Sequence, residues 1–538
     1  MSASSKKKLR NAEQAEKMTE KQLVEQKEAK KLKLYTTLAV VILVALVAFA
    51  AYTGISKMIT GSGIRERNTV ALTIGDNKIS NAELNYYYID SVNDFYNQYG
   101  NYAGLVGLDV TKPLNEQVLS GEDRMTWADN FLQGAIENVK STYALVAEAK
   151  ANGVTLPEES TAAIDSALDM MEVYATAYGY PNVKTYLKSM YGNGATVKGL
   201  RNFYEMSELA RYYQNQYRQS LTYTDDQLRA AEAENFNKFS SYDYNYYYLN
   251  IYNFIEGEKD ANGEYTAEQK AAAVAKAEEA AKSLVNGNTT VEQFDAAIAA
   301  LPINADNVST ASFTSENTAY GSIFSGYADW MTDPARKTGD MTYVASTSTD
   351  AEGNANTNGF YVVMFGSCND NNYALANVRH IQVAYEGGSY DSTTGVTTYT
   401  VEEKEAAKTE AESILNEWKA GAATEETFAA LANERSDDGD GTTGGLYENV
   451  YPGQMVDAFE DWCFDNRKVG DTGIVETEYG YHVMFYSGDS ETTYRDHMIS
   501  TELASNDYTA WYNALVEATT VEEHDFKYIS MDLVLYNA

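Results

Sequence analysis

An internal duplication in the second half of this 538-residue chain constrains its fold more than any other feature. Residues 266–294 and 400–428 each begin with a Thr-x-x-Gln or Thr-x-x-Glu capping box and run through an amphipathic segment to a phenylalanine at the same spacing. A strand-like apolar run precedes and follows each segment. The order strand, helices, strand occurs twice, which predicts two related α+β modules over residues 237–370 and 371–490.

The remaining residues are sufficient for a further domain, because one hydrophobic core rarely grows beyond about 250–300 residues. Residues 66–236 have a helical, amphipathic pattern that starts with a hairpin at 70–79 and a capping box at Ser80 and Glu83. Residues 491–538 add an amphipathic helix, NDYTAWYNALVEA, and a closing strand, FKYISMDLVLY. We expect this last block to pack against the N-terminal domain, and the predicted fold class is α+β.

A long apolar run near the N-terminus predicts a membrane anchor. Residues 34–55 are 22 consecutive residues without a charged side chain, and a helix of that length reaches about 33 Å, enough to cross a bilayer core of ~30 Å. Residues 1–33 carry ten Lys/Arg and five Asp/Glu, so the positive-inside rule predicts a cytoplasmic tail, a single-pass anchor and an extracytoplasmic remainder. Ala48-Phe49-Ala50 resembles a signal-peptidase site, and cleavage there is the alternative to an uncleaved anchor.

Charge and cysteine content exclude some classes of function. The formal net charge of −37 disfavours nucleic-acid binding, because proteins bind nucleic acids mainly by neutralising phosphates with Lys and Arg. Only Cys368 and Cys463 occur, so no disulfide framework holds the fold, and a bond between these two has no local support in the sequence. We predict no nucleic-acid partner, metal or cofactor, and the sequence predicts no oligomeric state.

The two copies of the duplication differ in their histidines. His380 lies in the first predicted strand of the second module and His482 in its last, whereas the first module contains no histidine. Tyr361 stands at the position of His482, and a tyrosine near Tyr248 stands at that of His380. Two strand histidines that are absent from the duplicate indicate a functional site in the second module.

Five segments of the second module carry a family resemblance through their order and spacing. They are VRHI at 378–381, FAALANERSDD at 428–438, Gly444-Gly445, GQMVDAFE at 453–460 and Gly480-Tyr481-His482. With these segments the module resembles the parvulin family of peptidyl-prolyl isomerases. The wider layout resembles the PrsA and SurA foldases, which have an N-terminal helical chaperone region, parvulin modules and a C-terminal helix that folds back onto the N-terminal part.

The resemblance implies a set of catalytic residues. His380 and His482 would lie side by side beneath the substrate amide and share a hydrogen-bond network. Asp438 falls on the family position held by cysteine or aspartate, where it would tune that network electrostatically. In isolation Asp437 and Asp438 have the pattern of an ordinary acidic loop, so this role depends on the resemblance.

The resemblance also implies substrate-binding residues, namely Tyr447, Met455 and Phe459. Met455 and Phe459, four residues apart on one predicted helical face, would line the slot for the proline ring. Parvulins usually read Gly-Gly-Asp-Leu-Gly where this chain reads GGLYE at unchanged length, so Tyr447 replaces an apolar residue beside the slot.

The leading hypothesis from the sequence is a membrane-anchored, extracytoplasmic foldase that isomerises X–Pro bonds in newly exported polypeptides and has chaperone activity. The helical chaperone-like domain spans 66–236, and the first module at 237–370 is degenerate, catalytically silent and either a spacer or a peptide-binding surface. The alternative is a non-catalytic holdase with a vestigial parvulin site. A third reading, a surface scaffold or adhesin, rests only on the acidic, tyrosine-rich composition.

Overall fold

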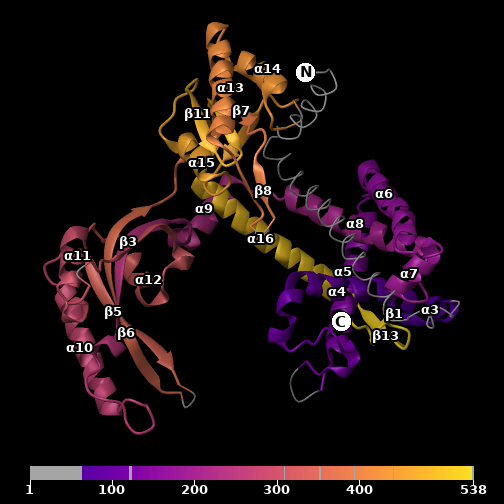
Figure 1. Cartoon of the computed structure of the whole chain (residues 1–538), viewed down its shortest axis with the longest axis horizontal. Helices are drawn as coiled ribbons and strands as arrows, with labels where there is room; N and C mark the ends of the chain where they lie inside the picture. The colour runs from indigo at the N-terminus through magenta and orange to yellow at the C-terminus, as the bar shows by residue number, and fades with distance from the viewer. Residues whose placement is uncertain are drawn as a thin grey trace. The chain divides into compact units, whose positions relative to one another are not determined.

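The computed structural model describes residues 63–119, 124–307, 309–350, 353–392, 394–439 and 441–535 (Figure 1). Residues 223–502 form one compact unit, here called the module unit, and residues 63–222 with 503–535 form a second, the helical unit. The predicted basic tail at 1–33 and the predicted anchor at 34–55 lie outside the described residues. No helix in the described stretches is long and apolar enough to cross a membrane.

The helical unit begins with the short helix α3 and a hairpin, and residues 81–220 then contain five helices of nine residues or more. Its elements are α3 (Ile64–Asn68), β1 (Val70–Ile74), β2 (Asn77–Ser80), α4 (Asn81–Tyr99), the 3-10 helices η2 (Gly100–Val106) and η3 (Leu114–Glu116), α5 (Trp127–Ala151), α6 (Glu158–Ala177), α7 (Val183–Tyr191) and α8 (Val197–Ser220). The predicted hairpin is confirmed, with Gly75 in the left-handed region at φ 56°. The successive tyrosines Tyr86, Tyr87 and Tyr88 of α4 are all buried in the core of this unit.

The predicted capping box at the start of α4 is only half formed. The hydroxyl of Ser80 accepts a hydrogen bond from the backbone N–H of Glu83 at 3.2 Å. The carboxylate of Glu83 instead accepts the hydroxyl of Tyr143 on α5, and burial raises the pKa of this carboxyl. Glu83 therefore contributes to the packing of α4 on α5 and leaves the capping to Ser80 alone.

The C-terminal residues complete the helical unit. Strand β13 (Val521–Glu523) pairs antiparallel with β1 and extends the hairpin to a sheet of order β13-β1-β2. The prediction of a closing strand in FKYISMDLVLY is wrong, because Ile529 and Leu535 insert into the helical core. The carbonyl oxygens of Met531 and Leu533 bond to the loop that contains η3, so the backbone of this segment has partners without a strand.

The module unit contains two sheets of the same topology, as the duplication predicts. The first module comprises β3 (Ser241–Asn250), α10 (Ala267–Val285), α11 (Val291–Ala299), β4 (Phe313–Ala319), α12 (Ser325–Met331), β5 (Met341–Thr349) and β6 (Ala355–Asn369). The second comprises β7 (Ala374–Ala384), β8 (Ser389–Asp391), β9 (Val396–Thr398), α13 (Val401–Ala420), α14 (Glu425–Arg435), β10 (Leu446–Val450), α15 (Asp457–Phe464), β11 (Thr472–Thr477) and β12 (Gly480–Thr493). The sheet orders are β4-β3-β6-β5 and β10-β7-β12-β11, all antiparallel.

Equivalent helices begin in the same way in both modules. Thr266 caps α10 and Thr400 caps α13, each through the reciprocal capping box that the sequence predicts. In the second module, α13 and α14 cover one face of the sheet, where Ile381 and Val383 of β7 meet their buried side chains. Because side chains alternate along a strand, His380 and Gln382 face the other side of that sheet.

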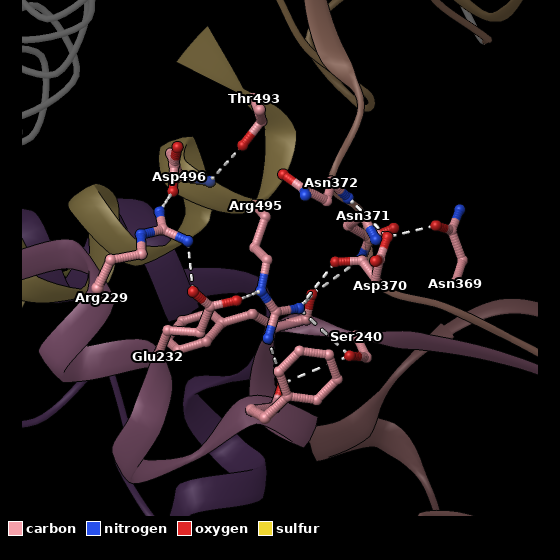
Figure 2. Close-up of polar contacts among 12 residues, drawn as sticks. Arg229, Glu232, Ser240, Asn369, Asp370, Asn371, Asn372, Thr493, Arg495 and Asp496 are labelled. Carbon is pink, nitrogen blue, oxygen red and sulfur yellow. Dashed lines mark hydrogen bonds and ion pairs between the residues drawn. The ribbon is translucent and has the colours of Figure 1, made fainter. Parts of the chain in front are cut away.

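A buried arginine forms hydrogen bonds to the two segments that flank the first module (Figure 2). Arg495, at the start of α16 (Tyr494–Glu517), is 1% exposed. Its guanidinium donates to the carbonyl oxygens of Phe236 at 2.7 Å and Phe239 at 3.1 Å, before β3, and of Asp370 at 2.7 Å, between the modules. The same guanidinium forms an ion pair with Glu232 of α9 (Asp225–Glu234). This one side chain therefore satisfies three carbonyl groups in two segments, the 3-10 helix Phe236–Phe239 before β3 and the link between the modules.

Candidate active site

The two strand histidines lie on the central pair of strands of the second sheet. His380 of β7 lies opposite Met484, and His482 of β12 lies opposite Gln382, so the histidines are diagonal neighbours on one face. Their ring centroids are 5.3 Å apart and the two Nδ1 atoms are 3.1 Å apart. The side chains are 2% and 5% exposed, so the register of this strand pair creates a buried histidine pair.

The surroundings of His482 disfavour a positive charge on its imidazole. Burial, and in second place the neighbouring His380, lower the pKa of His482 well below its usual value of 6.5. His482 is therefore neutral at pH 7. Two facing Nδ1 atoms at hydrogen-bond distance also require that one of them carries a proton and the other accepts it.

Asp438 approaches the pair from the loop that follows α14. Its Oδ2 atom lies 3.0 Å from Nε2 of His380, a charge contact without the alignment of a hydrogen bond. Two preceding residues tie the loop to β7: the Ser436 hydroxyl accepts from the backbone N–H of Gln382 at 2.6 Å, and Asp437 donates its own N–H to the carbonyl of Gln382 at 2.8 Å. These bonds bring Asp438 to the side of His380.

Tyr447 lies within the same network rather than on an open slot. Its side chain is 2% exposed, and its ring stacks on His380 with the centroids 4.7 Å apart. The hydroxyl donates to Oδ2 of Asp438 at 2.6 Å. The sequence predicted an aromatic side chain beside the proline slot and did not foresee this hydrogen bond.

Thr477 is a member of the network that the sequence analysis missed. Its Oγ1 atom lies 2.9 Å from Nε2 of His482, at the end of the β11–β12 hairpin where Thr477 faces Gly480. The threonine also accepts the backbone N–H of Tyr479 at 3.2 Å. The sequence could have predicted this threonine, because a tight hairpin places Thr477 opposite the glycine of Gly480-Tyr481-His482.

The donors and acceptors of the network permit a directed arrangement of its protons. The carboxylate of Asp438 favours a proton on Nε2 of His380, which leaves Nδ1 of that ring as an acceptor. In this arrangement His482 donates from Nδ1, and its Nε2 accepts the hydroxyl of Thr477, which also lies 3.3 Å from a second acceptor, the carbonyl oxygen of Gly480. The positions of the nitrogen and oxygen atoms are compatible with this set of tautomers.

The two expected proline-slot residues lie in different environments. Phe459 of α15 is 2% exposed and its ring centroid lies 5.3 Å from that of His380 and 5.5 Å from that of His482. The prediction that Met455 shares a helical face with it is wrong, because α15 begins at Asp457 and the extended residue Val456 caps it. Met455 is half-buried in the turn before the helix.

The second glycine of Gly444-Gly445 is required for a steric reason. Gly445 has φ 65°, and a Cβ atom there would lie 2.2 Å from the carbonyl oxygen of His380. The backbone N–H of His380 donates to the carbonyl of Gly445 at 3.0 Å. Only glycine permits this approach, which leads the chain into β10 and places Tyr447 opposite Val378.

In the first module, tyrosines occupy the two positions that correspond to His380 and His482. Tyr361 stands at the position of His482, as predicted, and the pairing of β3 with β6 assigns the position of His380 to Tyr246. The sequence had pointed to the vicinity of Tyr248, two residues away. The ring centroids of Tyr246 and Tyr361 are 6.1 Å apart, so the paired arrangement persists with different side chains.

Both cysteines lie apart from the histidine network as free thiols. Cys463 is buried on α15, where burial raises the pKa of its thiol to about 12, and Cys368 is exposed on β6. Within the described residues, no group of three or more His, Cys, Asp or Glu side chains could hold a metal ion. The chemistry available at the site is thus that of a buried, hydrogen-bonded imidazole pair beside the aromatic rings of Tyr447 and Phe459.

Comparison with known proteins identifies a family domain at this position. Residues 360–486 match the family model of the PPIC-type PPIASE domain. Among solved structures, the chain is similar to the PPIase domain of TbPar42, with 20% identity over 21% of this chain and 99% of that chain and a TM-score of 0.17. It is also similar to PrsA from Bacillus cereus, with 24% identity over 28% of this chain and 50% of that chain, and from Bacillus subtilis, with 23% over 27% and 48%; both TM-scores are 0.17. The match thus spans about half of each PrsA chain, and a search of the curated proteins found no match.

Proposed function

We propose that this protein is a foldase that catalyses cis/trans rotation of X–Pro bonds in polypeptides, since residues 360–486 carry a PPIC-type PPIase domain. The second module is a peptidyl-prolyl cis–trans isomerase domain of the parvulin type. The observation that carries the proposal is the buried pair of His380 and His482 inside that domain, with their Nδ1 atoms 3.1 Å apart.

The proposed chemistry needs no covalent intermediate. Rotation about a peptide bond crosses a barrier of ~18–20 kcal/mol, and the twisted amide loses the resonance and charge separation of the planar form. A water-poor site with neutral walls stabilises the twisted form relative to the planar one. Each tenfold gain in rate requires only about 1.4 kcal/mol of such differential stabilisation.

The described residues suit these requirements in two ways. His482 stays uncharged because its pKa lies well below the usual value, so this imidazole is polar without carrying a positive charge. Phe459 contacts both imidazole rings with its edge and supplies an apolar wall. In this proposal Met455, in the preceding turn, completes the slot for the proline ring, and His380, Asp438 and His482 form the catalytic network.

The proposal extends to the cellular setting of the foldase. The uncharged run at 34–55 and the basic tail at 1–33 support a single-pass anchor with the modules outside the cytoplasm. Newly exported polypeptides are then the substrates, and residues 66–236 serve as a chaperone domain. Protease treatment of intact cells tests this arrangement: cleavage of residues 63–535 from outside is expected, and full protection would contradict it.

The first module is proposed to bind peptide without catalysing rotation. It has tyrosines at both histidine positions, and Tyr327 of α12 lies 6.0 Å from Tyr361 between ring centroids, as Phe459 lies near His482. Phe313 and Phe324 are 59% and 37% exposed beside these rings. Aromatic rings with polar hydroxyl groups suit the capture of extended peptide segments that contain apolar residues.

The direct test is exchange spectroscopy on a short unphosphorylated X–Pro peptide. The wild-type chain is expected to accelerate cis/trans exchange, and the His380→Ala/His482→Ala double variant is expected to lack this activity while remaining folded. Assisted refolding of a client protein is measured in parallel on both. Absence of exchange from a folded wild type that still assists refolding would favour the alternative, a non-catalytic holdase with a vestigial site.

A further inference from the structure

Tyr447 is the residue at which this site departs from the usual parvulin pattern, and its environment differs from that of a slot residue. Its side chain is almost fully buried, so the ring presents little surface to a peptide. Its hydroxyl donates to Oδ2 of Asp438, and the same oxygen lies 3.0 Å from Nε2 of His380. One carboxylate oxygen therefore receives both the tyrosine hydroxyl and the imidazole edge.

Two further contacts hold Tyr447 in this arrangement. Its backbone is paired with Val378 of β7, two residues before His380. Its ring stacks on the imidazole of His380 at an interplanar angle of 25°, so the hydroxyl is directed past the ring to the carboxylate. At 2.6 Å the contact has the length of an O–H···O⁻ hydrogen bond to an ionised acceptor, which is stronger than one between neutral groups.

We propose that Tyr447 is a positioning residue whose hydroxyl fixes the carboxylate of Asp438 against Nε2 of His380 and so assigns the protons of the histidine pair. With Asp438 held in this position, His380 carries its proton on Nε2 and His482 carries its proton on Nδ1. The effect on rate rests on the proposed isomerase function, whereas the proton assignment is a property of the folded module alone. Tyr447 acts through Asp438 and does not need to touch the substrate.

The structure offers a matched pair of substitutions for a test. Tyr447→Phe removes the hydroxyl and keeps the ring that stacks on His380. Tyr486→Phe is the control, because Tyr486 is also buried in the same module and donates its hydroxyl to Asp489. Within the described residues, Asp489 has no hydrogen bond to His380, Asp438 or His482 and thus stands outside their network. Each variant loses one tyrosine–aspartate hydrogen bond, so a general loss of stability affects both.

The experiment combines imidazole 15N chemical shifts with peptide exchange kinetics on the full chain. In the wild type and in Tyr486→Phe, His380 is expected to show the Nε2–H form and His482 the Nδ1–H form. In Tyr447→Phe, both rings are expected to show mixtures of tautomers, and kcat/KM is expected to fall about tenfold through kcat, with KM unchanged because the ring remains.

The outcomes separate this inference from the proposed function. Unchanged tautomers in Tyr447→Phe would overturn the positioning role, whatever happens to the rate. A loss that appears only in KM would also overturn it, because it would make Tyr447 a substrate contact. Shifted tautomers in a protein whose wild type shows no exchange would support the positioning role and contradict the isomerase.

Discussion

The Nδ1 atoms of His380 and His482 face each other at 3.1 Å, although 102 residues separate them in the chain. At this distance one nitrogen must donate and the other accept, and a second proton between them would turn one ring into a buried imidazolium whose N–H faces another N–H. The lowered pKa of His482 agrees with this constraint. His482 is therefore uncharged at pH 7, and its contact with His380 leads to measurable consequences.

Removal of one imidazole should abolish most of the catalysis without unfolding the module. In His482→Ala, we expect kcat/KM for an X–Pro peptide to fall tenfold or more, because His380 and Thr477 lose their shared partner. Peptide exchange measures the rate, and circular dichroism verifies the fold. His524→Ala is the control, since His524 lies in the helical unit and contacts Thr73; a similar loss in both variants would contradict the assignment of the site.

The proline slot makes a separate prediction. Phe459→Ala should lower both activity and stability, because this buried ring contacts both histidines and its loss creates a cavity that costs about 3–5 kcal/mol. Met455→Ala should lower activity tenfold or more and change the free energy of unfolding less, because Met455 is only half-buried. Urea titrations and exchange kinetics separate the two effects. Wild-type activity in Met455→Ala would exclude this residue from the slot.

The stability of the second module should depend on pH through His482. The folded state lowers the pKa of His482, whereas the unfolded chain keeps a value near 6.5. Well above pH 6.5, His482 is neutral in both the folded and the unfolded protein, and its contribution to the free energy of unfolding is fully present. As the pH falls below 6.5, the unfolded chain takes up a proton that the folded module does not, and the free energy of unfolding decreases. Between about pH 7.5 and 5.5, we expect the wild type to lose about 1 kcal/mol more than His482→Gln in urea titrations. An equal loss in both proteins would contradict the depressed pKa.

The junction around Arg495 should be critical for the stability of the module unit. In Arg495→Met, the carbonyl groups of Phe236, Phe239 and Asp370 lose their buried donor, and we expect a loss of about 3–5 kcal/mol in the free energy of unfolding. Arg435→Met is the matched control, because Arg435 forms its two ion pairs at a partly exposed surface, where such pairs contribute about 0–1 kcal/mol. Similar losses in the two variants would contradict a special role of the junction.

The first module should bind peptides and leave their prolyl bonds unchanged. In the full chain with His380→Ala/His482→Ala, exchange is expected at the uncatalysed rate, because the tyrosines of the first module provide no equivalent of the imidazole pair. A peptide containing aromatic residues should still bind, and Phe313→Ser/Phe324→Ser should weaken this binding several-fold in fluorescence titrations. Exchange above the uncatalysed rate in the double-alanine protein would show that the first module is active.

Sequence patterns alone determined the features of this protein that depend on local structure. Capping boxes at Thr266 and Thr400, the amphipathic helices after them and the strand-like runs repeat at one spacing, so the duplication and the α+β class were readable without coordinates. The presence of His380 and His482 in only one copy likewise indicated which module holds the site. Such signals are local because each depends on residues within one helix or one strand.

Only the tertiary structure decided how these parts form a site. The register between β7 and β12 brings the two Nδ1 atoms into contact, and a slip of one residue would turn one histidine to the opposite face. The pairing of β10 with β7 places Tyr447 where its hydroxyl bonds to Asp438, a contact that the sequence did not predict. Met455 lies in the turn before α15 and not on the helix. These contacts join separate elements whose relative placement depends on strand register, loop hydrogen bonds and core packing, and no local periodicity encodes that placement.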